Sequence, residues 1–196
     1  MKNNVLLLLF LASSITLLSQ NKADLDLLIT DDTWRKEAFP FPIPFAPEID
    51  YTGYEEAQFA KGWSNPESEE FWTYSFIWHI DTEKELTEKE LEINLQYYFD
   101  GLMKIINKDT SLTLPPTLAL FIKKGNERGI STYQGKVKFY DAFFNKDLYE
   151  LNIIVEQDFC RTKDKLNVLF KFSPKDFNDA IWENLGEIRV NSEVCE

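Results

Sequence analysis

The sequence predicts an α+β fold, in which two helices pack against a single antiparallel sheet that contains a meander. Apolar residues between 88 and 107 recur at steps of three and four, as they do on one side of a helix. Segments between 130 and 172 alternate apolar and polar residues and are joined by short polar turns, as in a meander. Ser173 and Pro174 indicate the start of a second helix. A β-barrel-like ligand carrier is the alternative fold.

The chain begins with a short basic segment followed by an apolar run, MKNN and then VLLLLFLASSITLLS. This pattern predicts a signal peptide over residues 1–20, because the apolar run is too short for a spanning helix. We therefore expect an exported protein, periplasmic or secreted, with no stable membrane insertion after cleavage. The formal net charge of -12 argues against nucleic acid and anionic membranes as partners.

Residues 21–50 are expected to form a leader and a proline-rich arm, and residues 51–196 a single domain. The arm reads FPFPIPFAPEID, and its prolines favour an extended path. The residues between the prolines are too apolar for a free linker. We expect this arm to cover a face or an edge of the sheet.

The first half of the domain is predicted to contain two strands and a helix. The strands are expected at 54–63 and 71–81. In the second strand Trp72, Tyr74 and Trp78 share one face, because side chains alternate with period two. The helix is expected at 87–107, where Thr87 and Glu90 match a capping box.

The second half is predicted to contain four strands and the second helix. Residues 117–123 are apolar on both faces, which favours a central strand, and 125–129 have the composition of a turn. The meander strands are expected at 130–144, 148–159 and 165–172. Residues 187–195 form either a last short strand or a continuation of the helix.

The two cysteines, Cys160 and Cys195, are expected to form a disulfide, because an even count in an exported chain favours pairing. A catalytic thiol is not expected, since the only histidine is the only available base. One histidine also gives no zinc site by itself. The chain has 7 glycines and no phosphate-binding loop, so the sequence predicts neither a metal nor a cofactor.

The first functional hypothesis is an accessory or binding protein without catalytic activity. We expect an aromatic groove near Trp63, Trp72, Tyr74 and Trp78, because binding sites combine apolar walls with a few polar groups. The partner would be an apolar or sugar-like small molecule, or another exported protein. A Trp72 that is sealed in the core would remove this site.

The alternative hypothesis is a periplasmic or secreted hydrolase. Its general base would be His79, oriented by Asp81, Glu55 or Glu56. The two glutamates alternate faces in a strand, so only one is expected to point inward, and burial would require a cationic partner. The candidate partners are Arg35 and Lys61.

The block FPFPIPFAPEIDYTGYEEAQFAKGW, continued by FWTYSFIWHID, resembles a block of small exported bacterial proteins of unassigned function. The resemblance implies export and brings no catalytic residues. The order of two strands, a helix, a meander and a final helix also resembles PsbP-like and Mog1-like domains. This second resemblance is one of layout alone, and it implies the same α+β class.

Overall fold

The computed structural model describes residues 26–196 and confirms the α+β class. The main sheet has seven antiparallel strands in the order β2-β3-β4-β8-β7-β6-β5. A second sheet pairs β1 with β9. The predicted signal peptide lies outside the described residues. The elements are β1 (Leu28–Ile29), β2 (Arg35–Pro40), β3 (Gly53–Phe59), β4 (Tyr74–Asp81), α1 (Glu88–Ile106), β5 (Leu118–Glu127), β6 (Ile130–Tyr140), β7 (Leu148–Cys160), β8 (Lys165–Ser173), α2 (Ile181–Glu187), β9 (Arg189–Val190) and a 3-10 helix (Ser192–Cys195).

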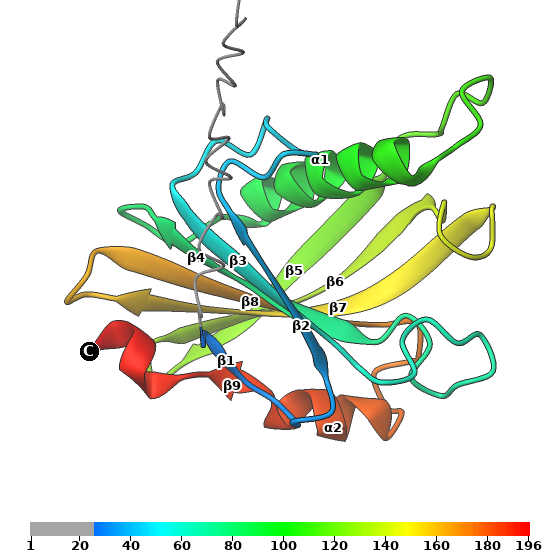
Figure 1. Cartoon of the computed structure of the whole chain (residues 1–196). Coiled ribbons are helices and arrows are strands. Elements are labelled where there is room, and N and C mark those ends of the chain that lie inside the picture. Colours follow the sequence, from blue (N-terminus) through cyan, green and yellow to red (C-terminus); the bar gives the residue numbers. More distant parts are fainter. Residues whose placement is uncertain (1–25) are drawn as a thin grey trace, which may run out of the picture.

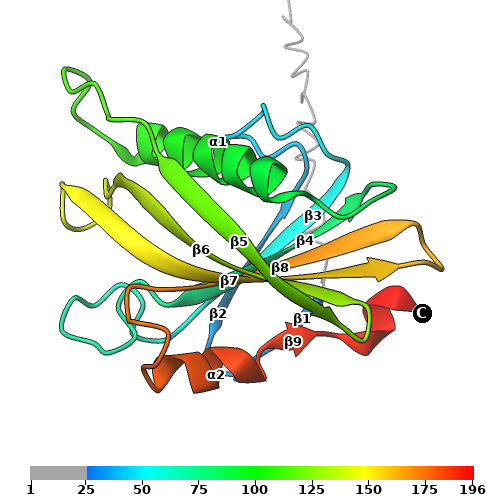
Figure 2. The ribbon, with the colours of Figure 1, turned by 180° about the vertical axis from the view of Figure 1, so that it is seen from behind.

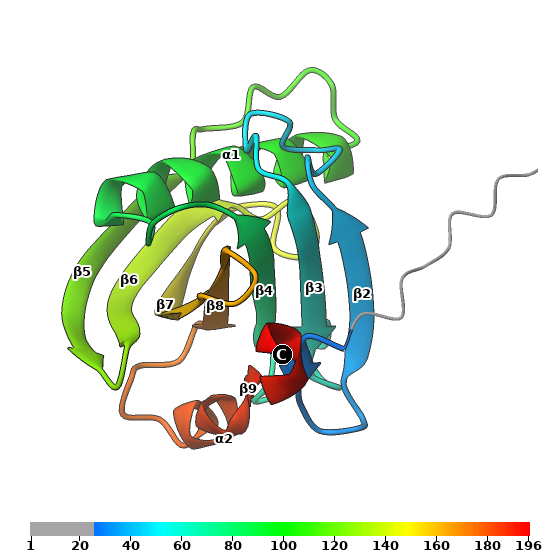
Figure 3. The same cartoon turned by 90° about the vertical axis from the view of Figure 1, so that its left-hand side faces the viewer.

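Helical layers cover both faces of the main sheet. Helix α1 crosses one face, and α2 with β1 and β9 lies across the opposite face (Figures 1 and 3). Successive side chains of β4 point to opposite faces of the sheet. Phe76 and Trp78 pack with α1 residues, while Ile77 packs with α2 residues. All three side chains are 0% exposed. The predicted aromatic face is therefore core, and the mixed face is buried as well.

Helix α1 forms as its sequence predicts. Thr87 is the N-cap, and its hydroxyl and the Glu90 carboxylate complete a reciprocal capping box. The buried residues of the helix lie on one stripe that faces the sheet: Leu91, Asn94, Leu95, Tyr98, Phe99 and Met103.

The proline-rich arm is part of the folded unit. Phe39 and Pro40 are the last residues of β2, which pairs with β3 at the edge of the main sheet. The later residues Ile43 and Ala46 are fully buried in the core cluster that also contains α1 residues. Gly101 of α1 permits this packing, because a Cβ at that position would lie 1.8 Å from the Phe45 carbonyl oxygen. The expectation that the arm covers the domain is confirmed.

The prediction that 117–123 is a central strand was wrong, because β5 lies at the edge opposite β2 (Figure 2). The side chains of α1 cap its outer backbone groups: the Asp100 carboxylate accepts from Thr117 N at 2.7 Å, and Glu92 accepts from Phe121 N at 3.3 Å. The expected turn at 125–129 is also too long. The strand continues to Glu127 through an irregular register, and Arg128 and Gly129, both with positive φ, make the turn.

Several predicted boundaries also differ from the structure. Strand β4 begins at Tyr74, because Trp72 has a φ of 56° and the chain turns there. Strand β6 ends at Tyr140, where the buried Asp141 begins a tight loop. Helix α2 begins at Ile181 instead of Ser173. The Lys175 carbonyl oxygen makes no helical hydrogen bond. It accepts hydrogen bonds from the side chains of Asn152 and Trp182 instead.

Of the two alternatives for residues 187–195, the structure contains the short strand, limited to Arg189–Val190, and α2 ends at Glu187. The C-terminal segment forms β9 and then a 3-10 helix that ends at Cys195, which is bonded to Cys160 as predicted. The bond connects the end of β7 to the C-terminus, and this is consistent with export. Within residues 26–196, no helix has the length and apolar character that a membrane span needs.

Candidate functional site

An aromatic cavity of about 450 Å³ lies between β2, β3 and the C-terminal half of α1. Its walls come from elements far apart in the sequence, and the loops after β3 and β6 complete them. The volume is in the range of small-molecule sites. Nine aromatic side chains line it: Phe39, Phe45, Phe59, Trp63, Trp72, Tyr74, Tyr98, Phe143 and Phe144.

Asp141 holds together the two loops that complete the cavity. It is 0% exposed, and its Oδ1 accepts from Phe143 N at 2.8 Å and from Phe144 N at 3.1 Å. Its Oδ2 accepts from Trp72 Nε1 at 3.3 Å. One buried carboxylate thus fixes three of the aromatic lining residues, so the wall is pre-formed.

Two charged side chains of β2 line the cavity from the edge of the sheet. Arg35 and Glu37 form an ion pair of 2.9 Å, with side chains that are 60% and 39% exposed. The Arg35 guanidinium carbon lies 5.2 Å from the centre of the Phe59 ring and 5.6 Å from that of Trp63. These distances are in the range of cation–π contacts.

A buried carboxyl group, Glu55, lies in the core next to the cavity wall. It is 0% exposed and accepts hydrogen bonds from Trp78 Nε1 at 2.7 Å and from the Tyr98 hydroxyl at 2.8 Å. Burial raises the pKa of Glu55 to about 7, and the two hydrogen bonds oppose this rise. Because Tyr98 lines the cavity, Glu55 also fixes one part of the wall.

The structure brings three of the four predicted groove residues together. Trp63, Trp72 and Tyr74 line the cavity. Trp72 is 3% exposed and belongs to the main core cluster, so only a small part of its side chain lines the cavity. Trp78 is 0% exposed and lies in the core as the partner of Glu55.

The residues of the hydrolase hypothesis are dispersed. Glu55 faces α1, while Glu56 faces the opposite layer, where it accepts from Leu27 N at 2.8 Å and lies 3.2 Å from Lys36 Nζ. Both glutamates are buried, contrary to the expectation of one. The cation at Glu56 is Lys36, instead of the predicted Arg35 or Lys61. Asp81 pairs with Lys165.

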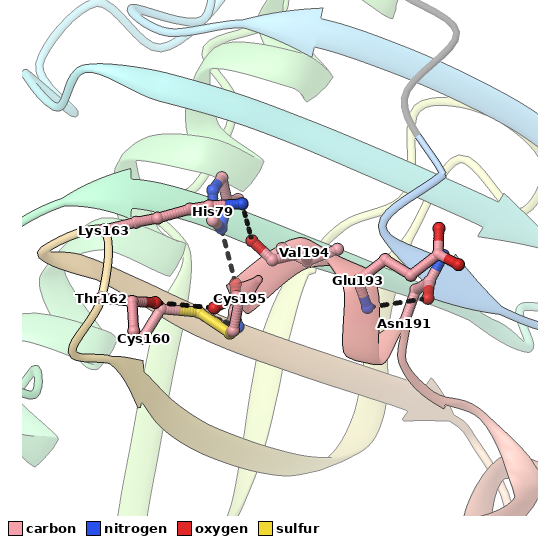
Figure 4. The surroundings of a disulfide bond; sticks show 9 residues. His79, Cys160, Thr162, Lys163, Asn191, Glu193, Val194 and Cys195 are labelled. Carbon is pink, nitrogen blue, oxygen red and sulfur yellow. Dashed lines mark hydrogen bonds between the residues drawn. A yellow bond between two sulfur atoms is a disulfide. The ribbon is translucent and has the colours of Figure 1, made fainter.

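His79 is adjacent to the disulfide instead of a carboxylate (Figure 4). Its Nδ1 donates to Asn167 Oδ1 at 2.7 Å, and Asn167 Nδ2 lies 3.2 Å from Cys160 Sγ and 3.4 Å from Cys195 Sγ. Burial lowers the pKa of His79. Within the described residues no carboxylate hydrogen-bonds to the imidazole, so the structure does not form an acid–base pair there.

Sequence reasoning missed several residues of the cavity. The alternation of the sequence places Phe143 and Phe144 in a strand, whereas β6 ends at Tyr140 and both lie in the loop that follows. Arg35 and Glu37 were not grouped with the tryptophans, because the pairing of β2 with β3 is a long-range feature.

Comparisons with protein-family models, curated proteins and solved structures found no match for this chain. In the part of the chain that the structure describes, no group of three or more His, Cys, Asp or Glu side chains is placed to hold a metal ion.

Proposed function

We propose that this chain is an exported binding protein, without catalytic activity, that holds a small apolar molecule in the aromatic cavity. The observation that carries the proposal is the cavity of about 450 Å³ with its nine aromatic lining residues. The apolar N-terminal run and the disulfide support export.

The construction of the wall supports binding rather than simple packing. Most of the lining residues lie on strands or on α1, and Asp141 fixes the loop residues among them. A rigid wall lowers the ordering cost of binding. The hydrolase alternative has less support, because His79 contacts Asn167 and the glutamates bind other groups.

The test is a titration with the neutral probe N-phenyl-1-naphthylamine, whose fluorescence rises in an apolar site. Trp63→Ala removes a half-buried wall residue and should weaken binding about tenfold, which corresponds to about 1.4 kcal/mol. Trp34→Ala is the matched control, since Trp34 is also half-buried but lies on the α2 side of the sheet. Circular dichroism checks that both variants are folded.

A second variant, Leu102→Trp, fills the cavity from α1 instead of opening it. It should also reduce probe binding while Trp34→Ala leaves it unchanged. Equal probe affinity in the wild type, Trp63→Ala and Leu102→Trp would refute the proposed site.

A further inference from the structure

The charged groups at the cavity indicate the chemistry of its ligand. The Arg35 guanidinium lies over the rings of Phe59 and Trp63 and is paired with Glu37. Ring faces attract cations because their quadrupole is negative at the face. This part of the cavity is therefore a place where a cation is stabilised, and a side chain of the protein itself occupies it.

Two carboxyl groups lie on the strands that form this edge of the cavity. Glu37 lies on β2 and Glu55 on the adjacent β3, where Glu55 is opposite Phe39 in the register. The negative charge of Glu37 contributes to the raised pKa of Glu55. The hydrogen-bond donors of Glu55 are an indole and a phenol, both neutral. A buried carboxylate is costly without a nearby positive charge.

The Tyr74 side chain adds a polar group to the wall. It is 5% exposed and lines the cavity, and within the described residues its hydroxyl makes no hydrogen bond. Burial raises the pKa of this hydroxyl well above its usual value, so it stays neutral. The hydroxyl oxygen is not among the buried side-chain atoms of residues 26–196 that lack a partner, which are Ser75 Oγ and Asn152 Oδ1. It therefore adds a solvent-accessible polar group to the wall that a ligand in the cavity can contact.

We propose that the cavity takes a small organic cation with an apolar body, such as an aryl-alkyl quaternary ammonium. The ligand's cation replaces the Arg35 guanidinium over the rings of Phe59 and Trp63 and is balanced by Glu37. This inference rests on the proposed function and names its ligand class.

The electrostatics favour a cation over an anion. The whole chain carries a net charge of -12, which attracts cations over long range. An anionic ligand would have Arg35 in its favour but would approach the Glu37 carboxylate, which also lines the cavity. Like charges that are brought together in a partly desolvated site are unfavourable.

Three probes of similar size separate charge from shape. They are benzyltrimethylammonium, its neutral isostere 2,2-dimethylpropylbenzene, and the anion 4-tert-butylbenzoate. Binding is measured by quenching of tryptophan fluorescence, because Trp63 and Trp72 line the cavity. We expect the cation to bind about tenfold more tightly than its neutral isostere, and the anion most weakly.

Variants of the ion pair give changes of opposite sign. Glu37→Gln should weaken binding of the cationic probe about fivefold to tenfold and leave the affinity for the neutral probe unchanged. Arg35→Gln should strengthen binding of the cationic probe, because it removes the guanidinium that competes for the ring faces. The matched control is the exposed pair Lys136 and Glu150, at 2.7 Å on another part of the sheet. Lys136→Gln and Glu150→Gln should leave the affinities for all three probes unchanged.

The outcomes separate this inference from the proposed function. If the neutral and cationic probes bind equally well, the inference is overturned while the binding function stands. If the anion binds most tightly and Arg35→Gln abolishes its binding, the ligand is an anion and the inference is again overturned. If none of the probes quenches the wild type, the proposed function itself fails.

Discussion

The buried carboxyl of Glu55 should make the stability of this protein depend on pH in an unusual direction. Its pKa is about 7 in the folded state, against a reference of 4.5. Between these two values the folded protein keeps a proton that the unfolded chain has released. The free energy of unfolding should therefore fall as the pH rises from about 4.5 to about 7, and then level off.

The structure sets the size of this effect. A tenfold change in proton affinity corresponds to about 1.4 kcal/mol. The free energy of unfolding should therefore fall by about 3 kcal/mol between pH 4.5 and pH 7. Glu55 is 0% exposed, so solvent screening is small. The pKa of His79 is lowered by burial, so His79 gives the opposite trend, with stability lost as the pH falls below 6.5. A comparison of variants is needed to isolate Glu55.

The assay is urea unfolding of the wild type and Glu55→Gln from pH 4.5 to 8, followed by tryptophan fluorescence. A glutamine keeps an acceptor for Tyr98 but turns an amide donor toward Trp78 Nε1. It should cost about 1–3 kcal/mol at pH 4.5, where Glu55 of the folded wild type is protonated. The difference between the two proteins should shrink by about 3 kcal/mol as the pH rises.

Glu150→Gln, at an exposed carboxylate, is the control and should reproduce the wild-type profile. The reasoning would be refuted if Glu55→Gln kept the full pH dependence of the wild type. That result would mean that Glu55 has a similar pKa in the folded and unfolded states.

Two further predictions concern the loops and the C-terminus. Asp141→Ala should lower the free energy of unfolding by about 3 kcal/mol and weaken probe binding, because it leaves several donors of the cavity loops unpaired. The control is Asp147→Ala, which affects only a local contact of an exposed side chain. It should change neither the free energy of unfolding nor probe binding in the same assays. Replacing Cys160 and Cys195 together by serine should cost about 3–4 kcal/mol in urea unfolding, since the bond closes a loop with a sequence separation of 35; a loss below about 1 kcal/mol would show that the bond constrains little.

Local patterns in the sequence predicted the local parts of this fold. The helix stripe and capping box of α1, the alternation of β6 to β8 and the cysteine pair depend on nearby residues or on simple counts, and the structure contains them. The position of β5 could not be predicted in this way. Its apolar residues favoured a central strand, yet Leu118, Leu120 and Ile122 are exposed at an edge whose outer backbone groups are capped by α1.

The candidate site was predicted in part for the same reason. Trp63, Trp72 and Tyr74 are clustered in the sequence, so composition was enough to group them. The contributions of Arg35 and Phe144 depend on the pairing of β2 with β3 and on the path of the loop after β6. Such long-range contacts have no signature in a local window.

The claim that the aromatic cavity is a binding site is tested most directly by a crystal structure of the protein grown with 4-bromobenzyltrimethylammonium. The anomalous signal of bromine locates the probe without prior assumptions. We predict one strong peak inside the cavity bounded by Phe59, Trp63 and Tyr74, with the Arg35 side chain moved off the rings. An empty cavity, or a peak only in another hollow such as the one beside Asn107 and Pro115, would contradict it.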